Sequence, residues 1–382
     1  MRGIAALVVV MAHALSGLAP NSTAYPQPGS LVFAALNGSA AVAFFFVLSG
    51  FVLPLSYFRG RQTRTIAVAL VRRWPRLAGL TTIACVGSWL LFTTGAYHYR
   101  TAGMLSGSQW LQTMGNALFP ADFVPSVTGA VRQGSALTFF TGDNYYDPVL
   151  WTMQFEMAGS VVSLLLAPIL LNAPRALGVI VAVLVAAGLY ALDPRLVGFV
   201  VGTCFAWWLQ EPAPSFTPRQ AALMITLSLL LLGIPWNGAV GDYAPLAMVL
   251  PSNDVVPLLW DAGSCLLIGA VLGCRRIEAL LSTRLAVLLG RISFPVYLVH
   301  FPILCSLGSW IYVRALVQYG NKVAVVAAVI ATLAATLGGS LPLAAFDQWW
   351  VRRVKLVVAE LSDVTVRQLR RSTQRDGSRL VS

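Results

Sequence analysis

Two side chains that could do chemistry share the first hydrophobic stretch of the chain, MRGIAALVVVMAHALSGLA. Arg2 and His13 are the only ionisable side chains within it. A guanidinium group binds anions such as phosphate, and a neutral imidazole accepts a proton near pH 7. On an α-helix, eleven residues bring the second side chain to within about 20° of the first and about 16 Å further along the axis. This spacing indicates one long molecule held at both points.

The composition predicts a polytopic membrane protein. Hydrophobic residues make up 57% of the 382 residues, charged residues only 10%, and the mean hydropathy is +0.75. These values exclude an ordinary soluble domain and make membrane lipid an expected partner. The net charge of +12 has a topological explanation because the basic residues flank hydrophobic segments, so no nucleic-acid partner is expected. The five cysteines show no CxxC pair and no metal-ligand spacing, so no metal is expected.

The hydrophobic segments predict an all-α transmembrane bundle of about ten spans. In a bilayer about 30 Å thick, Arg2 would lie at one mouth of the first span and His13 near mid-depth, where polar groups are costly and usually functional. The predicted spans are residues 3–19, 39–57, 77–95, 149–171, 176–192, 196–210, 220–235, 257–274, 292–313 and 323–346.

The basic residues predict the orientation of this bundle. With the N-terminus in the cytoplasm, 21 of the 26 Lys and Arg residues lie inside. The positive-inside rule therefore predicts that both termini are cytoplasmic, in a multi-pass protein of the cell membrane. Residues 1–346 form the expected membrane domain and 347–382 a basic cytoplasmic tail. This tail begins DQWWVRRVK, which predicts a membrane-surface helix that frays into disorder.

Two predicted outer segments, 96–148 and 236–256, are too long to be simple turns. They combine acidic and aromatic side chains, including Asp242, Tyr243 and the motif TGDNYYDP. Such side chains suit a polyhydroxylated ligand, and long surface loops often carry binding residues. A purely structural role for both segments stays open.

Five motifs lie in order along the chain. They are RGIAALVVVMAH with Arg2 and His13, FFFVLSGFVL with Ser49 and Gly50, VRRWPRL with Arg72, Arg73 and Arg76, VLWTMQFEM with Trp151, Thr152 and Glu156, and ISFPVYLVH with Ser293, Tyr297 and His300. Together they resemble the acyltransferase-3 family of integral membrane O-acyltransferases, which acylate envelope sugars. The resemblance covers residues 1 to about 346, and Gly79 stands where the family often places proline.

The resemblance implies transfer of an acyl group, most commonly acetyl, from cytoplasmic acyl-CoA to a hydroxyl of an envelope or exported glycan or glycoside. It identifies His13 as the candidate base, and the alternative is a core histidine hydrogen-bonded between helices. Arg2, Arg72, Arg73 and Arg76 are the candidate ligands of the donor phosphates. Positive-inside charge alone would also explain the three arginines of the loop.

Five further residues have expected roles. Glu156 is a candidate catalytic residue that faces the bundle interior, where it pairs with an arginine, orients a histidine or forms a purely structural ion pair. Tyr297 and His300 share a helix face and are expected to position substrate, as is Trp151. Ser49 next to Gly50 indicates close helix approach rather than an acyl-enzyme nucleophile.

Two other classes of function compete with the enzyme. A secondary transporter or permease for a lipid-linked glycan would also place polar residues at mid-membrane, but transporters often carry internal repeats. The pattern from Arg2 to His13 has no second copy in the chain. A membrane sensor or scaffold would not explain why two ionisable side chains, Arg2 and His13, share one face of the first helix.

Overall fold

The structure is a computed structural model of the whole chain. It describes all residues except 24, 117–122, 210–213, 239, 249–251 and 380–382, and residues 361–379 by their backbone alone. The described residues form helices and connecting turns, with no strand among them, which confirms the predicted all-α class. The α-helices are α1 Arg2–Leu18, α2 Gly38–Val52, α3 Leu55–Gly60, α4 Thr63–Thr93, α5 Tyr99–Ser106, α6 Gln109–Gln112, α7 Val127–Arg132, α8 Thr138–Phe140, α9 Trp151–Asn172, α10 Arg175–Leu192, α11 Val197–Trp208, α12 Pro218–Leu232, α13 Val256–Gly273, α14 Arg275–Leu281, α15 Arg284–Ile303, α16 Ser309–Tyr319 and α17 Asn321–Arg379.

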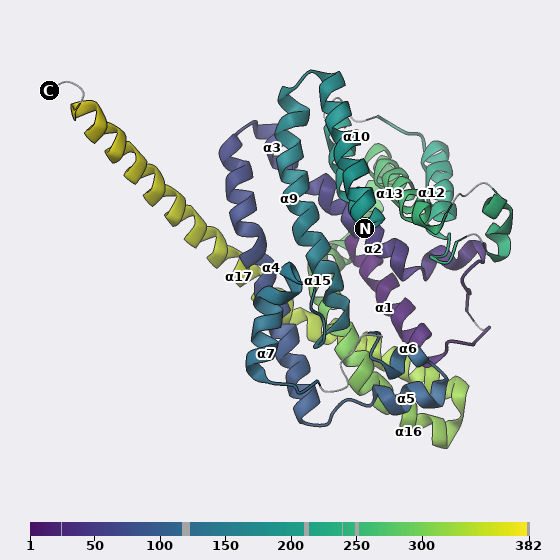
Figure 1. The fold of residues 1–382 in the computed structure, drawn as a ribbon. Coiled ribbons are helices and arrows are strands. Elements are labelled where there is room, and N and C mark those ends of the chain that lie inside the picture. The colour runs from purple at the N-terminus through teal and green to yellow at the C-terminus, as the bar shows by residue number, and fades with distance from the viewer. Residues whose placement is uncertain (24, 117–122, 210–213, 239, 249–251, 380–382) are drawn as a thin grey trace.

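Apart from a few residues at their ends, the predicted spans coincide with these helices, and the spans 39–57 and 292–313 each cover parts of two of them (Figure 1). Residue 210, the last of the span 196–210, lies outside the described residues. Within the described residues, seven helical stretches are long and apolar enough to cross a membrane. The helices α1 and α12 are apolar but shorter. Helix α11 has 12 residues, a length of about 18 Å that falls short of a bilayer core about 30 Å thick. The chain is therefore a multi-pass membrane protein, and the number of spans stays a prediction.

Glycines bring the backbones of α2 and α11 into direct contact. A Cβ atom on Gly50 would lie 2.2 Å from the carbonyl oxygen of Phe199, and one on Gly202 would lie 2.0 Å from that of Val47. Side chains at these positions would push the helices apart, and small residues let helices in membranes approach closely. The close approach predicted from Gly50 is confirmed.

Prolines and a π-helical turn shape the helix that carries Tyr297 and His300. Helix α15 contains Pro295 and Pro302, and residues Leu304–Gly308 form a π-helical turn before α16. Such turns bend helices and are frequent at functional sites. His300 lies two residues before Pro302, just ahead of this irregular segment, and its side chain is fully buried.

Helix α17 packs against α4 and then leaves the bundle. The indole N–H of Trp350 donates a hydrogen bond to the Pro75 carbonyl oxygen at 2.7 Å. A Cβ atom on Gly79 would lie 2.5 Å from Nε1 of the same indole, which explains glycine at a position where the family often has proline. Figure 1 shows the rest of α17 projecting from the bundle as a helix as far as Arg379. The predicted fraying of this tail is absent over these residues.

The far end of α1 meets α5 and α6, two short helices of the predicted outer segment 96–148 (Figure 1). Ser106 and Ser108 donate hydrogen bonds to the carbonyl oxygens of Gly17 and Ser16, at 2.8 and 2.9 Å. The loop after α1 also contacts the other predicted outer segment, because the backbone N–H of Leu31 donates to Asp242. Residues 117–122, 239 and 249–251 of these segments lie outside the described residues.

Candidate active site

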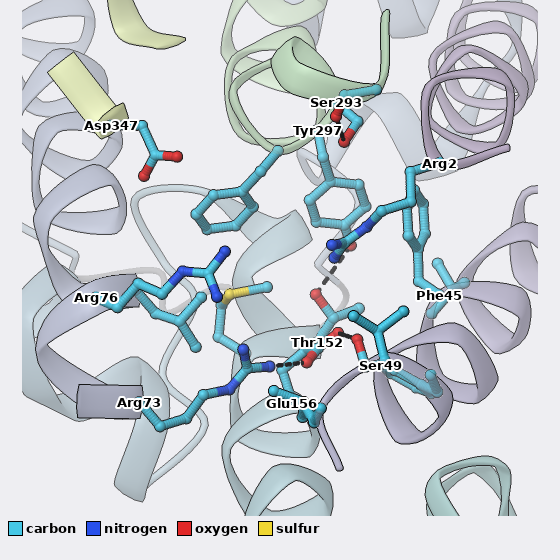
Figure 2. A pocket seen from close by; sticks show the side chains of 18 of the residues that line it. Arg2, Phe45, Ser49, Arg73, Arg76, Thr152, Glu156, Ser293, Tyr297 and Asp347 are labelled. Carbon is cyan, nitrogen blue, oxygen red and sulfur yellow. Dashed lines mark hydrogen bonds and ion pairs between the residues drawn. The ribbon is translucent and has the colours of Figure 1, made fainter. Parts of the chain in front are cut away.

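A cavity of about 630 Å³ opens beside the N-terminal end of α1. Its charged lining comes from the four helices α1, α4, α9 and α15 and from the start of the predicted tail. Apolar side chains such as Phe45, Met153 and Phe294 complete the wall. Figure 2 shows the guanidinium groups of the three arginines that it labels pointing into the space. The charged lining residues are Arg2, Arg73, Arg76, Glu156, Arg291 and Asp347.

An ion pair joins α4 to α9 at the floor of the cavity. A terminal nitrogen of Arg73 lies 2.5 Å from Oε2 of Glu156, and the Ser49 hydroxyl donates to Oε1 at 2.8 Å (Figure 2). Both charged side chains are almost fully buried. Nε of Arg73 has no hydrogen-bond partner among the described residues. Of the two partners expected for Glu156, the described residues therefore supply the arginine and not the histidine, and Ser49 is an additional partner.

The other three arginines of the cavity are available to an anion. Arg2, Arg76 and Arg291 are exposed, and none forms an ion pair with a described residue. Unpaired guanidinium groups around one space suit phosphate oxygens, which they bind through two parallel hydrogen bonds. Arg72 was predicted with this group, but it is not part of the cavity lining.

Tyr297 connects the cavity to the two histidines. Its hydroxyl donates to the Val149 carbonyl oxygen at 3.0 Å and lies 3.0 Å from the Thr152 hydroxyl, which fixes α15 against the start of α9. The Tyr297 ring faces the cavity, and its centroid lies 5.9 Å from that of the His300 ring. The predicted pairing of Tyr297 and His300 in one site is consistent with this geometry.

His13 and His300 are in direct contact although 287 residues separate them. Nδ1 of His13 lies 2.8 Å from Nε2 of His300, and the rings stack with centroids 5.1 Å apart. Nδ1 of His300 lies 2.7 Å from the Tyr297 carbonyl oxygen and 3.2 Å from that of Val296. Because a carbonyl oxygen only accepts, the proton of the neutral His300 ring is on Nδ1.

This arrangement also fixes the tautomer of neutral His13. Nε2 of His300 has only a lone pair to offer, so Nδ1 of His13 must donate the hydrogen bond between the two rings. Nε2 of His13 then carries a lone pair, and it has no other hydrogen bond within the described part of the chain. An imidazole oriented through one nitrogen and free at the other is arranged as a general base.

Aromatic rings enclose the histidine pair on its other sides. The centroids of Trp110 and Phe301 lie 5.2 and 5.5 Å from that of His13. His13 is not part of the lining of the arginine cavity, so the two halves of the site meet through Tyr297 and His300.

Trp151 lies outside both halves of the site. Its ring packs under the guanidinium group of Arg195, 4.8 Å from the centroid, beside Phe155. Arg195 also pairs with Asp193 at 2.5 Å. Burial raises the pKa of the Asp193 carboxyl, but hydrogen bonds and the charge of Arg195 outweigh it, so this pKa is lower than usual. The predicted role of Trp151 in positioning substrate has no contact with the cavity to support it.

Three residues of the site were not predicted from the sequence. Arg291 directly precedes the motif ISFPVYLVH, and this position could have marked it as a site residue. Asp347 begins the predicted tail and lies opposite Arg76 in Figure 2. Trp110 belongs to the outer segment 96–148 and lies in none of the five family motifs.

A family model described as an acyltransferase domain, that of the acyltransferase-3 family, matches residues 1–345. The chain therefore belongs to this family and is a membrane acyltransferase that transfers groups other than amino-acyl groups. No curated protein and no solved structure matches the chain.

Proposed function

We propose that this acyltransferase moves an acyl group, most simply acetyl, from cytoplasmic acyl-CoA to a hydroxyl of an envelope or exported glycan or glycoside. The observation that carries the proposal is that the two ends of α1 contribute to different parts of the site. One end of this helix contributes to a cavity with three unpaired arginines, and the other presents an imidazole with a free nitrogen. A donor with phosphates at one end and a thioester at the other fits this division.

The cavity would hold the nucleotide end of the donor. Arg2, Arg76 and Arg291 would bind its phosphates, while Arg73 and Glu156 would fix the floor. All of these arginines fall on the side that the positive-inside rule assigns to the cytoplasm, where acyl-CoA is found. The donor is a substrate and not a resident cofactor.

The acyl end would extend past Tyr297 to the histidine pair, because Arg2 and His13 lie about 16 Å apart along the axis of α1. Nε2 of His13 would take the proton of the acceptor hydroxyl as the oxygen attacks the thioester carbonyl. A carbon–oxygen bond forms, the carbon–sulfur bond breaks, and the leaving thiolate takes the proton from His13. His300 would orient His13 and stabilise the transient imidazolium through its Nε2 lone pair.

This function accounts better for the chain than a permease for a lipid-linked glycan. The family match favours an enzyme, and the donor cavity joins the predicted base through one tyrosine and one histidine. Because the acceptor is exported or lies in the envelope, the cell membrane is the proposed location, with both termini in the cytoplasm.

The donor site can be tested by comparing the replacement of arginines that line the cavity with the replacement of an arginine outside it. In the variant Arg76→Gln/Arg291→Gln, the dissociation constant of CoA should rise about tenfold or more, because charge-assisted hydrogen bonds are worth about 1.5–3 kcal/mol each. Arg72→Gln is the control, since it removes one charge from α4, the helix of Arg76, at a position outside the cavity. Titration calorimetry of the purified proteins with CoA measures the effect.

Equal CoA affinity in all three proteins would refute the cavity as the donor site. A loss of affinity in Arg72→Gln as large as in the double variant would instead assign the effect to overall charge. Topology would then be the whole explanation of the arginine cluster.

A further inference from the structure

Trp110 approaches the histidine pair from the side opposite the arginine cavity. It lies in α6, which packs at the far end of α1 from Arg2 (Figure 1). The indole is tilted by 37° to the His13 ring and meets Phe301 edge to face at 5.3 Å. Three rings of the described residues contact His13, and Trp110 is the one that comes from a predicted outer segment.

Several contacts hold the indole in this position. The Ser108 hydroxyl accepts the backbone N–H of Leu111 at the start of α6 and donates to α1. Gly115 has a φ of +69°, and its backbone N–H donates to the Trp110 carbonyl oxygen at 2.7 Å. A Cβ atom on Gly115 would lie 3.1 Å from Phe301 and 3.2 Å from the indole. The tight turn that follows Trp110 therefore favours glycine and packs directly on the indole.

Of the four rings at the His13 end of the site, those of His13 and Trp110 keep some exposed surface. His13 and Trp110 are both partly exposed, whereas His300 and Phe301 are 0% and 1% exposed. The exposed surface of His13 does not belong to the arginine cavity. An acceptor that reaches His13 from the predicted outer side therefore comes within reach of the indole, which contacts the His13 ring.

We propose that Trp110 is the residue on which the sugar ring of the acceptor stacks. The C–H face of a pyranose ring is apolar and flat, while its hydroxyl groups point outward from the ring edge. Stacked on the indole, such a ring keeps the apolar contact that an aromatic face offers and directs a hydroxyl towards His13. This inference rests on the proposed function and adds the residue that recognises the acceptor.

The test compares acceptor use in Trp110→Leu, Trp110→Phe and wild-type protein in lipid nanodiscs. The donor is labelled acetyl-CoA, and the acceptor is the glycan fraction extracted from cells that lack this protein. Trp110→Leu should raise the acceptor KM by about tenfold or more, whereas Trp110→Phe, which keeps an aromatic face, should stay within about threefold. The CoA dissociation constant should stay unchanged in both variants.

The matched control is Trp310→Leu, because Trp310 is a 43% exposed tryptophan on α16 with no ring contact to His13. An acceptor KM for Trp110→Leu within twofold of wild type would overturn the role of Trp110. A parallel loss of CoA binding, or failure of both Trp110 variants to fold, would assign the indole to structure alone. Absence of glycan-dependent transfer in the wild-type protein would refute the proposed function itself.

Discussion

The two ends of α1 have different surroundings. Around Arg2 the protein keeps an open cavity with long, unpaired cationic side chains. Around His13 it packs rigid, neutral rings at centroid distances of 5.1 to 5.5 Å. Charge attraction tolerates small changes of position, whereas proton transfer requires donor and acceptor within hydrogen-bond reach. One helix can therefore contribute both to a binding cavity that tolerates small shifts of its ligand and to a rigidly packed base.

The buried ion pair of Arg73 and Glu156 gives the strongest test of this contrast, because it is a rigid contact at the floor of the open arginine cavity. Either single change, Arg73→Gln or Glu156→Gln, should reduce stability by about 3–5 kcal/mol, since each leaves a buried charge without its partner. The double variant should be more stable than both single variants. Thermal unfolding in detergent, followed by the fraction of protein that stays monodisperse, measures the three effects.

If the single variants are as stable as wild type, the pair is not an anchor of the cavity floor. Additive losses in the double variant would show that the two side chains act independently.

A change at His300 tests the His13 end of the helix through a residue proposed to act on the reaction through its contact with His13. His300→Ala removes the acceptor for Nδ1–H of His13, so turnover should fall about 10²-fold while CoA affinity stays normal. His98→Ala is the control, since His98 has no contact with the histidine pair. Turnover and CoA binding must be measured on the same preparation. Normal turnover in His300→Ala would show that His13 is not held by the contact described here.

Most of the fold could be predicted from the sequence because the bilayer imposes strong rules. Long apolar segments must become helices, and all ten predicted spans fall on helices of the structure. Motif spacing also placed Arg2, Arg73, Arg76, Glu156 and Tyr297, which line one cavity. The same spacing could not separate Arg72 from Arg73 and Arg76, because residues three or four apart share a helix face and Pro75 interrupts the regular geometry.

Contacts between remote segments could not be predicted. The pair of His13 and His300 depends on how α1 packs against α15, and nothing local in either motif encodes it. Trp110 carries no signal because its neighbours in sequence form short turns outside the periodic helices. The length of α17 was also misjudged, since its polar end indicated fraying whereas the helix continues to Arg379.

The division of labour along α1 is tested most directly by comparing His13→Ala with Arg2→Gln. For each purified variant, the CoA dissociation constant and the turnover at saturating donor are measured together, with wild-type expression as the reference. His13→Ala should lose about 10²-fold or more in turnover with unchanged CoA affinity. Arg2→Gln should bind CoA about tenfold more weakly and keep near-normal turnover. Near-normal turnover in His13→Ala at normal expression would contradict the account.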